Sequence, residues 1–240
     1  KGLCAVAVTD HLEMVDYEDY VGTLVKSWRD SGEAVPAYAG RLRIARGIEL
    51  GEPLADLKRT EAILDAYDFD FVLGSQHKLN SLDRETNIDY YFYDYTGKDV
   101  GLVMDEYFDA VLELVNWGRF HALAHLTYPF RYIPEEKRPA DFSRWQDRID
   151  AILRQLAVKG LALEINTSGL RQPGGTTHPP LSLVRRFRQL GGEFITIGAD
   201  AHRPEDVGTG LEQAAALARE AGFTHQAVFF GGKMELLPLE

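Results

Sequence analysis

Short apolar runs alternate along the chain with longer stretches whose apolar residues recur at helical spacing. The runs expected to form strands are Leu3–Val8, Leu42–Ile48, Phe69–Leu73, His121–Leu126, Leu161–Ile165 and Phe194–Ile197, with a further one at Ala227–Phe230. The expected helices are Tyr17–Ser31, Pro53–Tyr67, Met104–Trp117, Ser143–Val158, Leu181–Leu190 and Gly210–Ala221. Strands that alternate with helices in this way predict an α/β fold with a parallel sheet.

Residues 78–104 carry neither pattern and are expected to form a long, irregular loop. Within this loop, Asp89–Tyr95 is rich in aromatic and acidic residues. A long loop at the C-terminal end of a strand often contacts substrate or covers a site, but it can also be an insertion that packs its own aromatic side chains. The sequence leaves both interpretations open.

Residue types that bind metals lie at the ends of most apolar runs. The segments are Thr9–His11, Gly47–Glu49, Gly74–His77, Ala124–His125, Leu163–Asn166 and Gly198–His202. In a β/α barrel the C-terminal ends of all strands meet at one mouth, so these side chains are expected to converge. Histidine and carboxylate ligands with almost no cysteine suit hard or borderline divalent metals. The pattern therefore predicts a metallohydrolase with more than one metal ion.

The ligands expected from this pattern are His11, Glu49, His77, His125, Asp200 and His202. A single histidine at a strand end is more often a hydrogen-bonded polar residue than a ligand, but six candidates at successive strand ends favour metal binding. Asp200 and His202 alternate, so an extended chain would turn both to one side. Of the remaining histidines, His121 is assigned to the opposite end of its strand, His178 to a solvent-facing turn and His225 to a loop.

Composition and charge narrow the possible partners. The 240 residues are enough for one α/β domain spanning 1–240. The formal net charge of −11 disfavours binding to nucleic acid, because such binding depends on Lys and Arg that neutralise phosphates. Bound cations can reverse the sign inside a pocket, so a small anionic substrate remains possible. No apolar stretch is long enough to span a membrane, and no signal-peptide pattern is present.

The only cysteine, Cys4, excludes an internal disulfide and, within an apolar run, is expected to be a buried and inert thiol. This cysteine usage fits a reducing cytoplasm. The chain begins at Lys1 rather than at a methionine and enters a strand almost at once, so residues upstream are expected to be missing from the sequence. The oligomeric state is left open.

Five of the strand-end motifs together resemble those of the PHP (polymerase and histidinol phosphatase) family over nearly the whole chain. They are Thr9–His11, Gly47–Glu49, Ser75–His77, Ala124–Leu126 and Gly198–His202. The segment Leu163–Arg171 is more specific, because its Asn-Thr-Ser-Gly-Leu-Arg sequence is similar to a segment of the histidinol-phosphate phosphatase branch. The resemblance implies a distorted (β/α)7 TIM-like barrel. The family opens with a His-x-His motif that no residue before His11 supplies, so the first barrel strand is expected to be missing here.

The resemblance also implies a site for three divalent metals, either Zn, Mn or Fe. The implied ligand sets are Asp200 for the first metal, His77 and His125 for the second, and His11 and His202 for the third, with Glu49 bridging two of them. Arg171 would face the substrate phosphate, and Asn166 and Ser168 would add substrate contacts. Asp200 and His202 are the expected catalytic residues, and either His202 or a metal-bound water would protonate the leaving alkoxide.

The function implied is hydrolysis of L-histidinol phosphate to L-histidinol and phosphate, a step of histidine biosynthesis. The acidic and aromatic residues 89–95 could receive the cationic imidazole or amine of that substrate. The alternatives are a PHP phosphoesterase that acts on nucleotides or other small phosphates, C–N hydrolysis of the amidohydrolase type, and a metal-binding domain without catalysis. The net charge disfavours a large polyanion, and no lysine occupies a strand end as an amidohydrolase ligand would. The missing His-x-His motif leaves the third alternative open.

Overall fold

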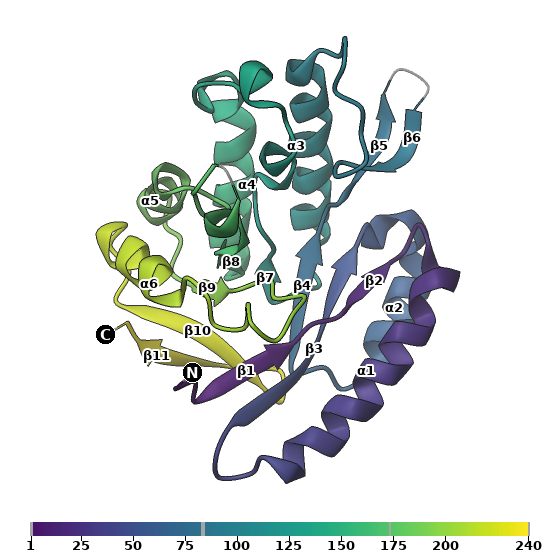
Figure 1. The fold of residues 1–240 in the computed structure, drawn as a ribbon, viewed down its shortest axis with the longest axis vertical. Helices are drawn as coiled ribbons and strands as arrows, with labels where there is room; N and C mark the ends of the chain where they lie inside the picture. The colour runs from purple at the N-terminus through teal and green to yellow at the C-terminus, as the bar shows by residue number, and fades with distance from the viewer. Residues whose placement is uncertain (1, 83–84, 173, 240) are drawn as a thin grey trace.

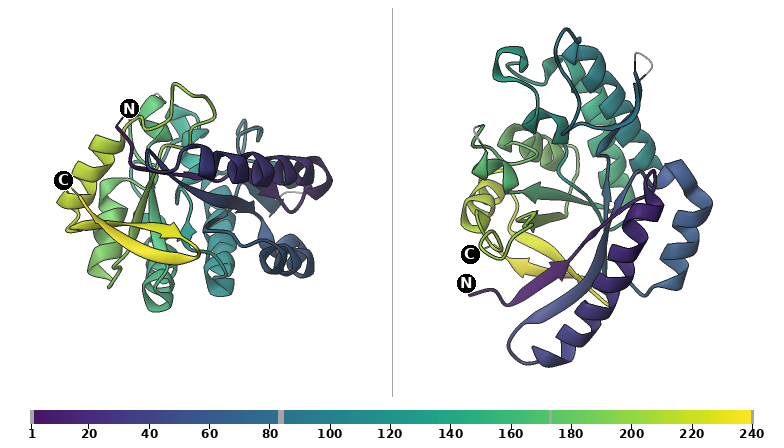
Figure 2. Two further views of the ribbon diagram at one scale, coloured as in Figure 1. Left: turned by 90° about the horizontal axis from the view of Figure 1, so that it is seen from below. Right: turned by 45° about the vertical axis from the view of Figure 1, so that its right-hand side comes forward.

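The computed structural model describes residues 2–82, 85–172 and 174–239. At its centre is a parallel sheet whose strands pair in the order β1-β3-β4-β7-β8-β9, with β2 also paired to β3. The strands are β1 (Ala5–Val8), β2 (His11–Glu13), β3 (Arg43–Gly51), β4 (Phe71–Ser75), β7 (Ala122–Leu123), β8 (Ala162–Asn166) and β9 (Ile195–Gly198). The sheet curls into a half-barrel with helices along its outer side (Figure 1, Figure 2). The predicted α/β class is confirmed.

Helices follow the strands as the sequence pattern predicts. They are α1 (Tyr17–Ala37), α2 (Leu57–Ala66), α3 (Val100–Trp117), α4 (Gln146–Lys159), α5 (Leu181–Gln189) and α6 (Leu211–Glu220). Helix α3 buries Val103, Tyr107 and Val111, which lie about one turn apart and face the core. Burying a side chain of this size contributes about 1.5–3 kcal/mol of transfer free energy. Among the described residues, no helix combines the length and the apolar character needed to cross a membrane.

Strands β1 and β2 are two parts of one extended segment that runs beside β3. Val8 pairs with Arg46 and His11 pairs with Glu49, so the register is the same on both sides of the break. Neighbouring strands lie about 4.8 Å apart. The backbone pairing alone therefore places His11 beside Glu49, at the C-terminal end of the sheet.

The expectation that Cys4 is buried in the first strand is wrong. Strand β1 is the edge strand of the described sheet and is only partly buried, and Cys4 and Ala7 are exposed. An edge strand has a neighbour on one side only, so an apolar sequence does not by itself ensure its burial.

Several predicted segments differ in extent; the strand expected at His121–Leu126, for example, is only Ala122–Leu123. Helix α1 runs past Ser31 to Ala37, so Gly32 lies inside the helix and does not end it. The Arg46 guanidinium packs against Gly32, 3.2 Å from where a Cβ of that residue would be. The stretch expected to be irregular contains an antiparallel hairpin of β5 (Lys78–Leu82) and β6 (Glu85–Asp89). The hairpin projects beside α3 (Figure 1).

Two apolar clusters lie on the two faces of the sheet. The larger cluster fills the space between sheet and helices, and the smaller one lies on the concave face near the N-terminal ends of the strands. In the smaller cluster, Phe229 stacks on Phe71 with ring centroids 5.1 Å apart. Phe229 belongs to β10 (His225–Phe230), which was expected as a further strand but forms a separate antiparallel sheet with β11 (Lys233–Pro238).

Candidate metal centre

Glu49, His77 and His125 meet at the C-terminal ends of β3, β4 and β7. The Nε2 atoms of the two histidines lie 3.1 Å apart, and Glu49 Oε1 lies 3.1 Å from that of His77 and 3.0 Å from that of His125. All three side chains are buried. Two imidazole nitrogens and a carboxylate oxygen crowded together away from water form a donor set that suits a divalent metal. The residues therefore fit the predicted ion.

His11 joins this cluster from β2. Its ring centroid lies 5.2 Å from that of His77 and 5.6 Å from that of His202. Glu13 accepts hydrogen bonds from Nδ1 of His11 and Nδ1 of His77, at 3.0 and 2.9 Å. Glu13 was not among the predicted site residues. Its alternation with His11 in an extended segment is the signal that could have identified it.

Asp200 and His202 follow β9 and reach the mouth at different depths. The Asp200 carboxylate is mostly buried and pairs with Arg131, with Oδ2 and Nη1 3.0 Å apart. His202 lies at the rim, with 67% of its side chain exposed, and donates from Nδ1 to the carbonyl oxygen of Asp200 at 3.2 Å. The structure thus brings the six predicted ligands to one end of the sheet.

Arg131 is a buried cation that the sequence analysis did not identify. It lies in a 3-10 turn (Tyr128–Arg131) in the loop after β7. Besides its ion pair with Asp200, its Nη2 donates to Asn166 Oδ1 at 3.1 Å. Its Nε is buried and has no partner among the described residues. No sequence pattern identifies this arginine as a site residue, because it does not lie at a strand end. It reaches the mouth from a proline-containing loop.

The predicted substrate contacts Asn166, Ser168 and Arg171 lie beside these ligands. Ser168 donates from its hydroxyl to Asn166 Oδ1 at 2.7 Å, and both side chains are buried. Arg171 donates from Nη2 to the carbonyl oxygens of Ala199 and Asp200, at 2.9 and 3.1 Å. It therefore braces the loop that carries Asp200, while its Nη1 is buried without a partner among the described residues.

Glu164 lies beneath the ligands on β8. It accepts hydrogen bonds from the backbone N–H of His125 at 2.9 Å and from Asn166 Nδ2 at 3.1 Å. Burial and the nearby Glu49 carboxylate raise the pKa of Glu164 to about 8. On the adjacent β9, a Cβ at Gly198 would overlap Glu164 Oε1, so the carboxyl group occupies space that the glycine leaves open.

Burial and neighbouring charges act against each other on the ligands. Burial alone would raise the pKa of Glu49, but His11 and a hydrogen bond from His125 hold it well below its ordinary value. Burial alone would lower the pKa of His77, but the Glu13 carboxylate raises it well above the ordinary value. Burial lowers the pKa of His125, which favours the neutral imidazole that binds metals.

Four residues at this end of the fold adopt left-handed backbone conformations, which residues other than glycine rarely adopt. The φ angles are +47° at Glu52, +24° at His125, +86° at Thr127 and +49° at Asp200. Such conformations cost about 1–3 kcal/mol each and tend to gather at functional sites. The packing around the mouth holds two predicted ligands, His125 and Asp200, in these conformations.

Known proteins resemble this chain over most of its length. A family model of the PHP domain matches residues 1–168. The chain belongs to the PHP family. The protein named "Histidinol-phosphatase" from Lactococcus lactis is 28% identical over 236 residues, which cover 98% of this chain and 86% of that protein. The protein named "Probable histidinol-phosphatase" from Thermotoga maritima is 32% identical over 187 residues, which cover 75% of this chain and 78% of that protein.

A solved structure of a PHP-type relative shares the fold. It is histidinol phosphate phosphatase from Lactococcus lactis in complex with zinc, L-histidinol and phosphate. The two structures align with a TM-score of 0.78 at 26% identity, over 98% of this chain and 88% of that one. The family predicted from the strand-end motifs is confirmed.

A wall of tyrosines leads from the PHP ligands toward the surface. The Tyr128 ring lies 4.9 Å from the rings of both His77 and His125. Tyr132 packs on Tyr128 at 5.2 Å, and Tyr91, which is 60% exposed, packs on Tyr132 at 5.1 Å. The predicted aromatic segment therefore reaches the mouth of the PHP fold by direct contact.

The acidic residues of that segment separate into two positions. Asp89 accepts a hydrogen bond from the Tyr128 hydroxyl at 3.3 Å and one from the Tyr91 backbone N–H at 2.7 Å. Asp94 is exposed and accepts the backbone N–H of Thr96 at 2.9 Å. Among the described residues of this segment, Asp89 and not Asp94 is hydrogen-bonded to the tyrosine wall, so Asp89 is the carboxylate nearer the predicted ligands.

The three other histidines of this PHP chain have different surroundings. His121 packs against Phe229 at the N-terminal end of the strands, as predicted, with ring centroids 4.8 Å apart. The prediction that His178 faces solvent is wrong, because it is buried and its Nδ1 lies 3.0 Å from Thr127 Oγ1. His225 is exposed but begins β10 rather than lying in a loop.

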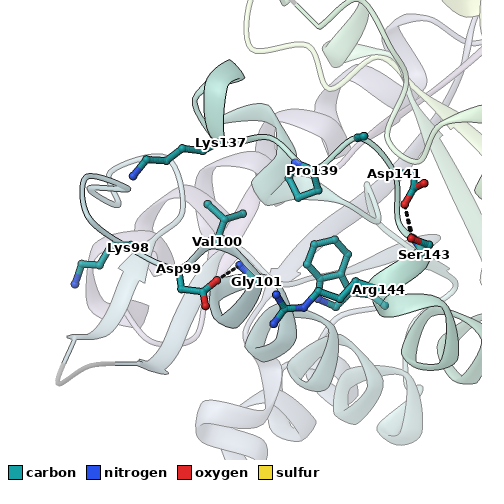
Figure 3. A pocket seen from close by; sticks show the side chains of 11 residues that line it. Lys98, Asp99, Val100, Gly101, Lys137, Pro139, Asp141, Ser143 and Arg144 are labelled. Atoms are coloured by element: carbon teal, nitrogen blue, oxygen red, sulfur yellow. Dashed lines mark hydrogen bonds between the residues drawn. The ribbon is translucent and has the colours of Figure 1, made fainter.

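A separate pocket of about 520 Å³ lies beside the N-terminal end of α3 (Figure 3). Asp99 accepts the backbone N–H of Gly101 there at 2.7 Å, and Arg144 pairs with Asp105 at 3.0 Å. The residues that line the pocket include none of the predicted metal ligands. Asp99 thus caps the start of α3, and the predicted metal ligands lie elsewhere, at the strand ends.

Proposed function

We propose that this protein is a metal-dependent phosphomonoesterase that hydrolyses L-histidinol phosphate to L-histidinol and phosphate in histidine biosynthesis. The observation that carries this proposal is the convergence of Glu49, His77 and His125, whose ligand atoms lie 3.0 to 3.1 Å apart at the mouth of a PHP fold. The relatives named as histidinol-phosphatases and the relative solved with L-histidinol and phosphate support this substrate.

The proposed centre holds three divalent metals, and zinc in the related structure makes zinc the first candidate, with Mn and Fe as alternatives. The proposed ligands are His11, Glu49, His77, His125, Asp200 and His202. When bound, the metals polarise phosphoryl oxygens and lower the pKa of a bound water to about 7. The proposed fold is the distorted (β/α)7 barrel of which the described sheet forms a half, and the proposed location is the cytoplasm.

Two arginines and a buried polar cluster form the phosphate side of the site. Asp200 and Asn166 hold the Arg131 guanidinium in place, which leaves its buried Nε without a partner among the described residues. The buried Nη1 of Arg171 likewise has no hydrogen-bond partner among the described residues. A planar guanidinium that is already fixed loses little entropy when it binds a phosphate oxygen. The Ser168 hydroxyl donates to Asn166 Oδ1, the oxygen that also accepts from Arg131, and so keeps Asn166 oriented toward Arg131.

The substrate's amine and imidazole lie toward the tyrosine wall in this proposal. Asp89 supplies negative charge at the wall, and Tyr128 supplies an aromatic face between Asp89 and the ligands. A cation is attracted both to a carboxylate and to an aromatic face. The proton that the leaving alkoxide needs would come from a metal-bound water, or from His202 where it does not hold a metal, since His202 lies exposed at the rim.

Phosphate release from L-histidinol phosphate tests the proposal, measured with the full-length protein and added Zn or Mn beside a panel of nucleotides and other phosphomonoesters. We expect selective turnover of L-histidinol phosphate that is lost in His202→Ala. Turnover of nucleotides in preference to L-histidinol phosphate would reassign the substrate. Absence of turnover on every ester would contradict the proposed enzyme activity.

A further inference from the structure

A single carboxylate oxygen lies between two of the proposed metal ligands. Glu13 Oε1 is 3.0 Å from His11 Nδ1 and 2.9 Å from His77 Nδ1. The Glu13 side chain is only 4% exposed, so water does not compete for these contacts. Each imidazole makes this contact through the same ring nitrogen, although one histidine lies on β2 and the other follows β4.

The surrounding backbone is shaped to hold this carboxylate. Glu13 and His11 alternate on β2 and face the same side. On the neighbouring β3, a Cβ at Gly51 would collide with the Glu13 carboxylate. The Glu52 carboxyl group is hydrogen-bonded to that of Glu13, and Glu52 Oε1 accepts the backbone N–H groups of His77 and Lys78 at 2.6 and 3.0 Å. Glu13 therefore occupies a prepared position and not an open surface.

The contact fixes which nitrogen each ring offers to a metal. An ionised carboxylate only accepts hydrogen bonds, so both Nδ1 atoms carry a proton and Nε2 is the nitrogen that each neutral ring would offer to a metal. For His77 this is consistent with the rest of the site, because its Nε2 points to Glu49 and His125. Carboxylates that orient ligand imidazoles in this way are common behind metal sites.

We propose that Glu13 is a positioning residue shared by two ligands, so that one carboxylate orients His11 and His77 and couples two metal positions. This inference rests on the proposed metal centre but not on the identity of the substrate. Its consequence is that removal of the Glu13 charge weakens metal binding at two positions together. An alternative arrangement has Glu13 itself bind a metal with the Nδ1 atoms of the same two histidines.

The two arrangements differ in which ring nitrogen of His11 and His77 binds the metal. Long-range 1H–15N correlation spectra of the zinc-loaded wild type, with His11 and His77 assigned through single His→Gln variants, report the tautomer of each ring. We expect a protonated Nδ1 and a metal-bound Nε2 in both rings. A metal-bound Nδ1 in either ring would overturn the shared positioning role. This measurement needs no Glu13 variant and is decisive even if such a variant folds poorly.

Zinc affinity gives the second measurement, by titration of the metal-free protein against a competing chelating dye. We expect Glu13→Gln to keep the number of bound zinc ions and to weaken two of them by about 10–100-fold, the usual effect of removing a ligand's hydrogen-bonding partner. Asp150→Asn is the matched control, because it removes a mostly buried carboxylate paired with Arg186 on α4 and α5. We expect unchanged zinc affinities in that control.

Two results of the titration would overturn the inference: loss of one zinc ion outright, which would make Glu13 a ligand, and weakening of only one position, which would remove the coupling. The result is independent of turnover. Zinc binding with the expected tautomers and two weakened positions in Glu13→Gln, but without hydrolysis of L-histidinol phosphate, would support the positioning role and contradict the proposed function.

Discussion

His121 and His125 lie at the two ends of one short strand segment and have opposite surroundings. His121 packs against Phe229, and its Nδ1 accepts the backbone N–H of Val72 at 2.8 Å. His125 lies among charged ligands, with its Nε2 3.0 Å from Glu49 Oε1. The same residue type thus packs against an aromatic ring at one end of the strand and lies in the predicted metal-binding cluster at the other.

The two ends differ in what covers them. At the N-terminal end the β10–β11 hairpin brings apolar side chains onto the concave face. At the C-terminal end the strands continue into loops that hold buried polar groups, several of them in left-handed backbone conformations. This division is the one expected of β/α barrels, in which stability resides at one end and the active site at the other.

The largest effect is expected from His125→Ala. Removing a ligand should cost more than the tenfold to hundredfold loss that follows removal of a ligand's partner, so we expect kcat/KM for L-histidinol phosphate to fall by about a thousandfold or more. His121→Ala is the matched variant on the same strand, and its kcat/KM should stay within about threefold of the wild type. Equal losses in both variants would remove the distinction between the two ends.

The second-largest effect is expected on the free energy of unfolding, from a substitution at the N-terminal end of the strands. Phe229→Ala removes a ring that stacks on Phe71 and leaves a cavity, so we expect the free energy of unfolding to fall by about 3–5 kcal/mol. Urea unfolding measures this change, and KM of the folded variant should remain unchanged. A raised KM without a loss of stability would show that the hairpin belongs to the site.

A smaller loss is expected from Arg131→Lys. Lysine keeps the charge but not the planar fork that Asp200 and Asn166 hold in place, so kcat/KM should fall by about 10–100-fold. Arg148→Lys changes an arginine that pairs with Asp109 away from the mouth and should have no effect. If Arg171→Lys alone impairs turnover, the phosphate contact lies with Arg171 and not with Arg131.

Substitution of an acidic residue in the aromatic segment, residues 89–95, is expected to change KM by about tenfold or less. Asp89→Asn should raise KM for L-histidinol phosphate by about three- to tenfold, because it removes negative charge beside the proposed amine and imidazole position. Asp94→Asn, an exposed carboxylate in the same segment, should leave KM unchanged. An unchanged KM in both variants would exclude this segment from substrate binding.

The smallest effect concerns pH. Burial lowers the pKa of His121, so between its folded pKa and about pH 6.5 the unfolded chain binds the additional proton. This histidine therefore lowers stability as the pH falls through that window. We expect His121→Phe to lose less stability than the wild type between about pH 7 and pH 5. Exposed His225→Phe serves as the control, and a pH dependence identical to the wild type in His121→Phe would contradict the assignment.

The convergence of the predicted ligands could be expected from the sequence because their positions follow from strand ends. Apolar runs mark the strands, parallel strands place their C-terminal ends together, and the residues just after the runs are therefore neighbours. His77 and His125 are far apart in sequence, yet their Nε2 atoms lie 3.1 Å apart for this reason. The same reasoning placed His121 at the opposite end of the fold.

The residues that were missed depend on packing that periodicity does not encode. Glu13 follows a break in an edge strand, and its place depends on the absence of a side chain at Gly51. Arg131 reaches the mouth from a turn, and His178 is buried through a contact with Thr127. The expected strand Ala227–Phe230 pairs antiparallel with β11 and not with the parallel sheet, because an apolar run does not reveal its pairing partner.

Zinc-dependent phosphate release from L-histidinol phosphate tests the central claim most directly. Metal-free full-length protein would be titrated with zinc while turnover is followed, for the wild type and His125→Ala in parallel. The account predicts no turnover without metal, a rise to a plateau as zinc binds, and no comparable plateau in His125→Ala. Undiminished turnover by the chelated wild type, or none at any zinc concentration, would contradict it.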